Sequence, residues 1–116
     1  MYNDYIDIQK GLSHMAGKKE IYIKIVNAFI SGSVEKIEDL KGFFAVEDFN
    51  RLMIEFHGVK SSSSAVGSTL LPVIALELES AARQGNNELI KEKFDEFISQ
   101  YEDTCAALDE AVEDLW

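Results

Sequence analysis

The sequence is poor in residues that break helices or crosslink chains. It holds one proline, Pro72, and one cysteine, Cys105, among 116 residues. A single cysteine excludes an internal disulfide, and a proline-poor chain rich in leucine, glutamate, alanine and isoleucine favours helices over strands. No stretch approaches the roughly 20 apolar residues of a membrane span, and the acidic N-terminus is unlike a secretory signal. We therefore expect a soluble, cytoplasmic, helical protein that does not associate with a membrane.

Basic residues are also scarce, with 11 lysines and arginines against 21 aspartates and glutamates, which gives a formal net charge of −10. A surface of that sign repels nucleic-acid phosphates and anionic lipid, so no nucleic-acid partner is expected. It suits a protein that is simply soluble or one that meets a basic partner. The length is that of one domain, and the hydrophobic fraction of 47% argues against disorder. We expect a single domain over residues 1–116.

Apolar residues recur at spacings of three and four in one short and four long segments, as in amphipathic helices. The short segment covers residues 4–15 and ends before Gly17, and the long ones cover about residues 18–44, 46–66, 68–85 and 86 to the C-terminus. Ser68 is the expected N-cap of the segment 68–85, and Asn86 is that of the segment from residue 86 onward. Gly67 is expected to end the segment 46–66. The four apolar stripes are Tyr22, Ile25, Phe29, Ile37, Leu40 and Phe44; Phe49, Leu52, Phe56, Val59 and Ser63; Leu71, Ile74, Leu78 and Ala82; and Ile90, Phe94, Phe97, Tyr101, Cys105, Leu108, Val112 and Leu115.

The connections between the long segments are short, so consecutive helices must run antiparallel. The sequence therefore predicts an all-α fold, an up-down-up-down antiparallel four-helix bundle with a short N-terminal extra helix. Cys105 lies on the stripe of the last helix and is expected to be a buried, small apolar residue. His14 lies near the end of the opening helix and is expected to be a surface or helix-end residue.

His57 carries the most interesting chemistry in the sequence. It lies about a third of a turn from the core stripe of its helix, which places it on the rim or the surface. An exposed imidazole can attack a phosphoryl donor, and Lys60, one turn later, would supply a cation for the phosphoryl oxygens. Ser61 and Ser64 are small enough for a partner to approach, and their hydroxyls could bond the phosphoryl group or the ring.

Other residues on and beside this face suit a docking surface. Asn50 and Met53 share the face of His57, and Gly58 clears space beside the histidine at some cost in helix stability. Met53 and Ile54 are expected to be partly exposed apolar residues, which suits a transient interface. From spacing alone, however, His57 and Lys60 could equally be ordinary surface residues, and Met53 could belong to the core.

Rival chemistries lack their motifs. Di-iron bundles use Glu-x-x-His on two helices, but the residues three before His57 and His14 are Ile54 and Gly11. No metal site is therefore expected. There is also no glycine-rich phosphate loop of the GxxxxGK[ST] type, which argues against an independent hydrolase.

The stretch His57-Gly-Val-Lys60-Ser-Ser-Ser-Ser64-Ala-Val-Gly67 resembles the signature of histidine-containing phosphotransfer (HPt) domains. That signature is a histidine, an apolar residue at +2, lysine at +3, small residues at +4 to +7 and glycine at +10. The later run 76–85 is similar to the next helix of the family, with its Leu-Glu pair and terminal glycine, and Gly11-Leu12 resembles the family's start. One departure is Ser61, where the family often has glycine; the added hydroxyl could alter partner choice or phosphohistidine lifetime.

The resemblance implies that His57 is phosphorylated, on the outer nitrogen Nε2, and that Lys60 helps to hold the phosphoryl group. It implies a phosphocarrier rather than an enzyme, working in a two-component His-Asp phosphorelay. The phosphoryl group would come from the aspartate of a receiver domain and pass to another. The expected partners are response-regulator receiver domains and a hybrid histidine kinase. The chain itself would bind no cofactor, since the partner receiver would supply Mg²⁺.

Several alternatives stay open at this point. An HPt-like bundle could also act as a phosphorylation-independent interaction module that docks a receiver or a kinase. The donor, the acceptor and the stimulus cannot be identified from the sequence, nor can a free-standing protein be distinguished from a domain of a larger kinase. A monomer is expected, although Trp116 or the pair Phe43-Phe44 could serve a dimer.

Overall fold

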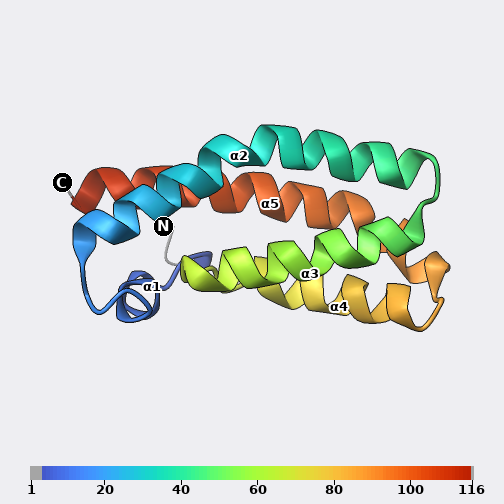
Figure 1. Ribbon diagram of the computed structural model, residues 1–116, viewed down its shortest axis with the longest axis horizontal. Helices are drawn as coiled ribbons and strands as arrows, with labels where there is room; N and C mark the ends of the chain where they lie inside the picture. Colours follow the sequence, from blue (N-terminus) through green and yellow to red (C-terminus); the bar gives the residue numbers. More distant parts are fainter. Residues whose placement is uncertain (1–3, 116) are drawn as a thin grey trace.

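The computed structural model describes residues 4–115, which form five helices. The helices are α1 (Ile8–Ser13), α2 (Lys19–Ala45), α3 (Phe49–Ala65), α4 (Leu71–Arg83) and α5 (Asn87–Leu115). Figure 1 shows α2 to α5 running alternately up and down the long axis, with α1 at the end where α3 passes into α4. The predicted four-helix bundle with an extra N-terminal helix is confirmed. Among the helices of residues 4–115, none has the length of apolar sequence that crossing a bilayer requires.

Side chains and glycines at the helix ends explain most of the boundaries. Asp48 accepts a hydrogen bond from the backbone N–H of Arg51 and so starts α3 at Phe49, three residues later than the sequence suggested. Asn86 caps α5 as expected, by accepting from the N–H of Leu89 at 3.3 Å. Gly85, with a φ of +73°, terminates α4 in the left-handed conformation that glycine adopts without strain.

The prediction that Ser68 caps α4 is wrong, because this residue belongs to a contact with the N-terminal segment. Ile6 and Ser68 form an antiparallel bridge, and the N–H of Asp7 donates to the carbonyl of Gly67 at 2.7 Å. Helix α4 therefore begins at Leu71, with Pro72 in its first turn. The same pairing shortens the opening helix, which was expected from residue 4 and begins at Ile8.

Gly67 has a second reason to be glycine besides ending the helix. Its φ is +86°, and a Cβ at this position would collide with the carbonyl oxygen of Asp7. The close approach of the N-terminal segment to the α3–α4 turn therefore depends on the absence of a side chain here. The sequence predicted that Gly67 follows the end of this helix, and α3 does end just before it, at Ala65.

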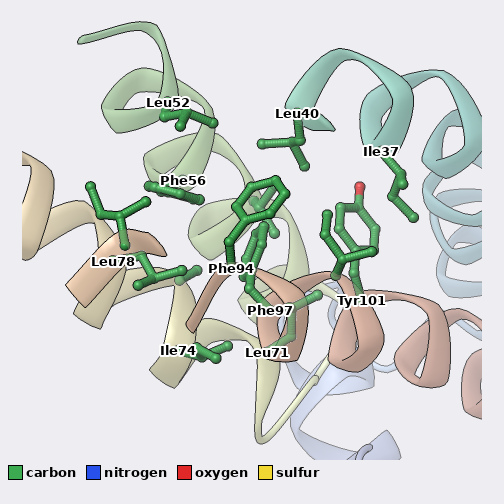
Figure 2. Close-up of a cluster of buried hydrophobic side chains, with 14 of the residues drawn as sticks. Ile37, Leu40, Leu52, Phe56, Leu71, Ile74, Leu78, Phe94, Phe97 and Tyr101 are labelled. Atoms are coloured by element: carbon green, nitrogen blue, oxygen red, sulfur yellow. The ribbon is translucent and has the colours of Figure 1, made fainter. Parts of the chain in front are cut away.

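The core inside the four helices is built on interlocking aromatic rings. Phe56 and Phe97 meet edge to face with centroids 5.1 Å apart, and Phe44 stacks on Phe94 at 4.1 Å. Figure 2 shows the aromatic and aliphatic side chains of all four helices converging on this centre. Phe43 and Phe44 are thus partly buried against the core, whereas Trp116, which was also considered for a dimer, lies outside the described residues.

Two residues of the predicted stripes are less buried than expected. Ile25 is 42% exposed, because the first turns of α2 turn Tyr22, Ile23 and Val26 inward instead, against the N-terminal segment and the end of α5. Cys105 is half-buried rather than buried, in a shallow hollow between α2 and α5. Helix α2 nevertheless continues unbroken through Gly32, as the long apolar pattern predicted.

Candidate functional site

The His57 side chain lies on the outer face of α3 and is 60% exposed. The core stripe of the same helix, Leu52, Phe56 and Val59, is buried, and it fixes which face of the helix turns outward. The position expected from the helical spacing is therefore the one found. Lys60 follows one turn later on the side that faces α4, and its side chain is half-buried.

A buried carboxylate lies beneath the imidazole. Glu79 of α4 has a side chain that is only 2% exposed, and its Oε2 lies 3.0 Å from Nδ1 of His57. Lys60 places its Nζ 3.0 Å from the other oxygen, Oε1, in an ion pair whose angles are not those of a hydrogen bond. Arg83, four residues later on α4, donates to Oε2 at 2.8 Å. Three nitrogen-bearing side chains from two helices thus meet on one carboxylate.

These contacts keep Glu79 ionised. Burial by itself raises the pKa of this carboxyl, but the close contacts with Lys60, His57 and Arg83 outweigh it and lower the pKa to about 2. A carboxylate can only accept hydrogen bonds, so the ring nitrogen that faces it, Nδ1, must carry the hydrogen. In the neutral ring, the lone pair is then on Nε2, the nitrogen that does not face Glu79.

A small apolar hollow opens beside the ring. It has a volume of about 270 Å³ and is lined by Met53, Ile54, His57, Glu79 and Arg83. Met53 is half-buried, and Ile54 is 57% exposed. Both residues are thus partly exposed and share a hollow with the histidine, while their part in docking stays a prediction.

The remaining predicted residues lie on α3, before and after His57. Ser61 is exposed and Ser64 half-buried, and within residues 4–115 neither hydroxyl is hydrogen-bonded to the imidazole. A Cβ added at Gly58 would meet no atom within 4 Å, so this glycine leaves open space beside His57. Asn50 is more distant, in a separate hollow where α3 begins near the α4–α5 turn.

Sequence reasoning missed Glu79 and Arg83. Glu79 was noted only as one of the residues in the run 76–85, although it directly follows Leu78 of the apolar stripe and precedes Arg83 by four. An acid at the edge of a buried stripe with a cation one turn away on the same helix is the pattern of a buried ion pair. That signal was available, but nothing in the sequence said that the histidine of another helix would share the carboxylate.

Residues 4–115 bring together no group of three or more His, Cys, Asp or Glu side chains suited to a cation. The second histidine lies apart from the site. His14 follows the last residue of α1, where it was expected, and its exposed ring contacts the carbonyl oxygen of Ala65 through Nδ1 at 3.3 Å.

Comparisons with known proteins concern the family and the fold of the chain. A family model described as the Hpt domain matches residues 24–116, which include the whole stretch from His57 to Gly67. Among solved structures, the fold is similar to that of histidine-containing phosphotransfer protein B from Pseudomonas aeruginosa, at a TM-score of 0.83 and 20% identity over 95% of this chain and 96% of that one. At this level of identity, the likeness concerns the fold alone. No curated protein matches the chain.

Proposed function

We propose that this chain, which belongs to the Hpt domain family, carries a phosphoryl group on Nε2 of His57 in a His-Asp phosphorelay. The observation that supports this most directly is the contact between Nδ1 of His57 and the buried, ionised Glu79. This contact orients an exposed ring, fixes its hydrogen on Nδ1 and leaves Nε2 as the nucleophile.

The transfer step follows from that arrangement. The lone pair on Nε2 attacks the phosphorus of an aspartyl phosphate on the donor, the new N–P bond forms, and the P–O bond to the aspartate breaks. The donor carboxylate leaves with the bonding electron pair, while the hydrogen stays on Nδ1. The phosphorylated ring then carries a positive charge, which the Glu79 carboxylate stabilises from 3.0 Å. The same charge makes the ring a good leaving group, so the acceptor aspartate can take the phosphoryl group by the reverse step.

Lys60 is a candidate for a cation on the phosphoryl oxygens, because it lies one turn after His57 and shares Glu79 with it. Ser61 and Ser64 line the surface that a partner must approach. In this proposal the chain is a carrier, and the receiver domain of the partner binds Mg²⁺ and contributes most of the catalysis. The partners would be response-regulator receivers and a hybrid histidine kinase, which meet a monomeric chain on the surface formed by Met53, Ile54, Gly58 and Asn50.

The test is the intact mass of the chain after incubation with phosphoramidate, and separately with a phosphorylated receiver domain and Mg²⁺. One added phosphoryl group that is lost in acid is expected on the wild-type chain. His57→Gln should take up none, and it should keep its fold because the side chain is exposed. His14→Gln is the matched control, since His14 also presents an exposed ring bonded through Nδ1, and it should be phosphorylated as the wild type is.

The alternative function, a docking module without phosphotransfer, predicts a different pattern. In that case no phosphoryl group is taken up from phosphoramidate or from any receiver, and a receiver or a kinase binds the wild type and His57→Gln equally well. That pair of results would replace the carrier proposal. Uptake that survives in His57→Gln but disappears in His14→Gln would refute the assignment of the site.

A further inference from the structure

We infer that the receiver docks across α3 and α4, with Leu76 of α4 as an apolar contact on one side of His57 and Ile54 of α3 on the other. This docking mode rests on the proposed function, and it extends the predicted docking surface to a helix on which no docking residue was expected. It leaves α2 outside the interface.

The outward face of α4 carries apolar side chains that the core does not use. Val73 is 66% exposed and Leu76 is 48% exposed, whereas Leu71, Ile74 and Leu78 of the same helix are buried. Residues three apart are neighbours on a helix, so the two exposed side chains form one patch. They make up only a small part of the roughly 800 Å² that each partner buries in a standard interface. The patch therefore suits one edge of a transient contact rather than a permanent dimer.

The patch is continuous with the site at His57. Leu76 precedes Glu79 by one turn, about 4.5 Å along the axis of α4, and Val73 precedes it by about 9 Å. Glu79 points toward α3, where it meets His57, and Leu76 is turned about 60° from it toward the outside. Figure 1 shows α3 and α4 side by side. A footprint of about 800 Å² has a radius of about 16 Å, so a receiver centred on His57 would cover Leu76 and reach Val73.

The charge between the apolar residues fits a receiver. Lys60 and Arg83 contribute two positive charges against the one negative charge of Glu79, so this part of an acidic chain is locally positive when the imidazole is neutral. In the proposed function the receiver binds Mg²⁺, which proteins hold with carboxylates, and it therefore brings an acidic pocket to His57. A second copy of the chain, docked through the same face, would instead bring a like positive group.

Helix α2 lies on the opposite flank of α3. It contacts α3 through Glu55, which bonds Lys36, whereas α3 contacts Glu79 of α4 through His57. Positions 55 and 57 are about 160° apart around a helix axis. A receiver that sits over α3 and α4 therefore leaves the exposed apolar residues of α2 uncovered, among them Ile25 and Val34.

These residues of α2 are matched controls, because their exposure is close to that of the residues of α4. Ile25 is 42% exposed, close to Leu76, and Val34 is 71% exposed, close to Val73. The first experiment labels the methyl groups of Ile, Leu and Val in the wild-type chain and follows their NMR signals as an unphosphorylated receiver domain with Mg²⁺ is added. The signals of Ile54, Leu76 and Val73 should shift, and those of Ile25 and Val34 should not.

The second experiment measures the KM for a phosphorylated receiver in variants of the two helices. Leu76→Asn should raise the KM about fivefold, because a polar amide replaces an apolar contact, and Ile25→Asn should leave it within about twofold. Leu76→Met should also stay within about twofold, since methionine keeps the apolar contact. Phosphoramidate, which needs no docking surface, should phosphorylate every variant as it does the wild type, and thermal unfolding confirms that each is folded.

Equal KM values in Leu76→Asn and Ile25→Asn, or methyl shifts at Ile25 without any at Leu76, would overturn this docking mode and leave the carrier function intact. Sedimentation of the chain alone tests the other occupant. A dimer of the wild type that is lost in Leu76→Asn would assign the face to a second copy and overturn the assignment to a receiver. Failure of the wild type to take up a phosphoryl group from any donor would instead overturn the proposed function.

Discussion

Two glutamates of the bundle, Glu55 and Glu79, have carboxylates that are buried to a similar degree, with 8% and 2% of their side chains exposed. Each is held by a lysine from the preceding helix and by an arginine one turn away on its own helix. The difference is that Glu79 also bonds His57. A buried glutamate paired with a lysine and an arginine therefore occurs twice, at Glu55 without a histidine and at Glu79 with one.

The site at Glu55 shows what such a pair of ion pairs does in the absence of a histidine. Lys36 of α2 contacts one oxygen of Glu55 at 2.6 Å, and Arg51 of α3 contacts the other at 3.3 Å. These contacts connect α2 to α3 and satisfy a carboxylate that would otherwise be costly to bury. Nothing in this arrangement presents a nucleophile.

In the proposed function, phosphotransfer thus requires one side chain, His57, in addition to a structural ion pair. At Glu79 the lysine and arginine offset the burial, which frees the carboxylate to hold an exposed imidazole in one orientation. Glu55 is then the natural control for every experiment on Glu79, because a variant of either residue disturbs a buried pair between neighbouring helices.

The largest expected effect that would separate the two sites is on phosphotransfer. Glu79→Gln should slow the transfer from a phosphorylated receiver by about 10- to 100-fold, because the ring loses the charge that orients it and stabilises its phosphorylated form. Glu55→Gln should change the rate by less than about twofold. Rates are measured by the appearance of phosphorylated chain in rapid-quench experiments. Similar losses in both variants would show that the rate depends on bundle integrity, and would remove the distinction between the sites.

A smaller effect is expected on stability, and here the two sites should behave alike. Each Gln variant should lose about 2 kcal/mol of unfolding free energy at pH 7, because the cations lose their charged partner in the interior. The measurement is urea unfolding followed by circular dichroism. A loss at Glu79 alone would mean that the ion pair at Glu55 contributes little, and that the two arrangements are not equivalent.

The loss of stability in Glu79→Gln should also depend on pH in the acid range. The pKa of Glu79 is lowered to about 2 from an ordinary value near 4.5. Its contribution is therefore fully present above pH 4.5 and is lost as the pH falls toward 2. The difference in stability between the wild type and Glu79→Gln should accordingly shrink between these pH values. A difference that stays constant to pH 2 would contradict the lowered pKa.

A further effect, of about tenfold, is expected from the surface next to Glu79. Ile54→Asp should raise the KM for a phosphorylated receiver about tenfold, because a charge replaces an apolar contact at the hollow beside His57. Ile25→Asp is the control, since Ile25 is similarly exposed on α2. Neither variant should change uptake from phosphoramidate, which needs no docking surface. A normal KM for Ile54→Asp would place the receiver elsewhere.

Much of the fold could be predicted because it depends on periodic apolar residues. The stripe of α3, with Leu52, Phe56 and Val59, points inward as expected, and this alone placed His57 outside. The errors arose where contacts distant in sequence decided the outcome. Ser68 is a good N-cap by residue type, but its pairing with Ile6 takes it out of the helix.

The site was predictable only along one helix. The spacing from His57 to Lys60 can be counted in the sequence, and the resemblance to the HPt signature covers the same stretch. The contact from His57 to Glu79 spans 22 residues and depends on the rotation of α4 against α3. The periodicity of apolar residues predicts which face of each helix is buried. It does not predict which side chains of two neighbouring helices contact each other at the border of the buried faces. For that reason Glu79 and Arg83 emerged from the structure.

The smallest expected effect is that of salt on transfer, because the helices that carry the two glutamates have little net charge. Helices α3 and α4 together hold three basic and three acidic residues, Arg51, Lys60 and Arg83 against Glu55, Glu77 and Glu79. Helix α5 from Phe94 onward holds eight acidic residues and no basic one.

Helix α5 packs mainly against α2 and α4, so its charge lies on the other side of a bundle about 22 Å thick from the outer face of α3. The Debye length is about 10 Å at 0.1 M salt, so little of this field reaches His57. The transfer rate from a receiver should therefore fall by only about twofold between about 0.05 and 0.5 M salt, through weaker steering of basic groups on the partner. A fall of tenfold or more would mean that the receiver contacts α5, and would contradict docking on α3 beside Glu79.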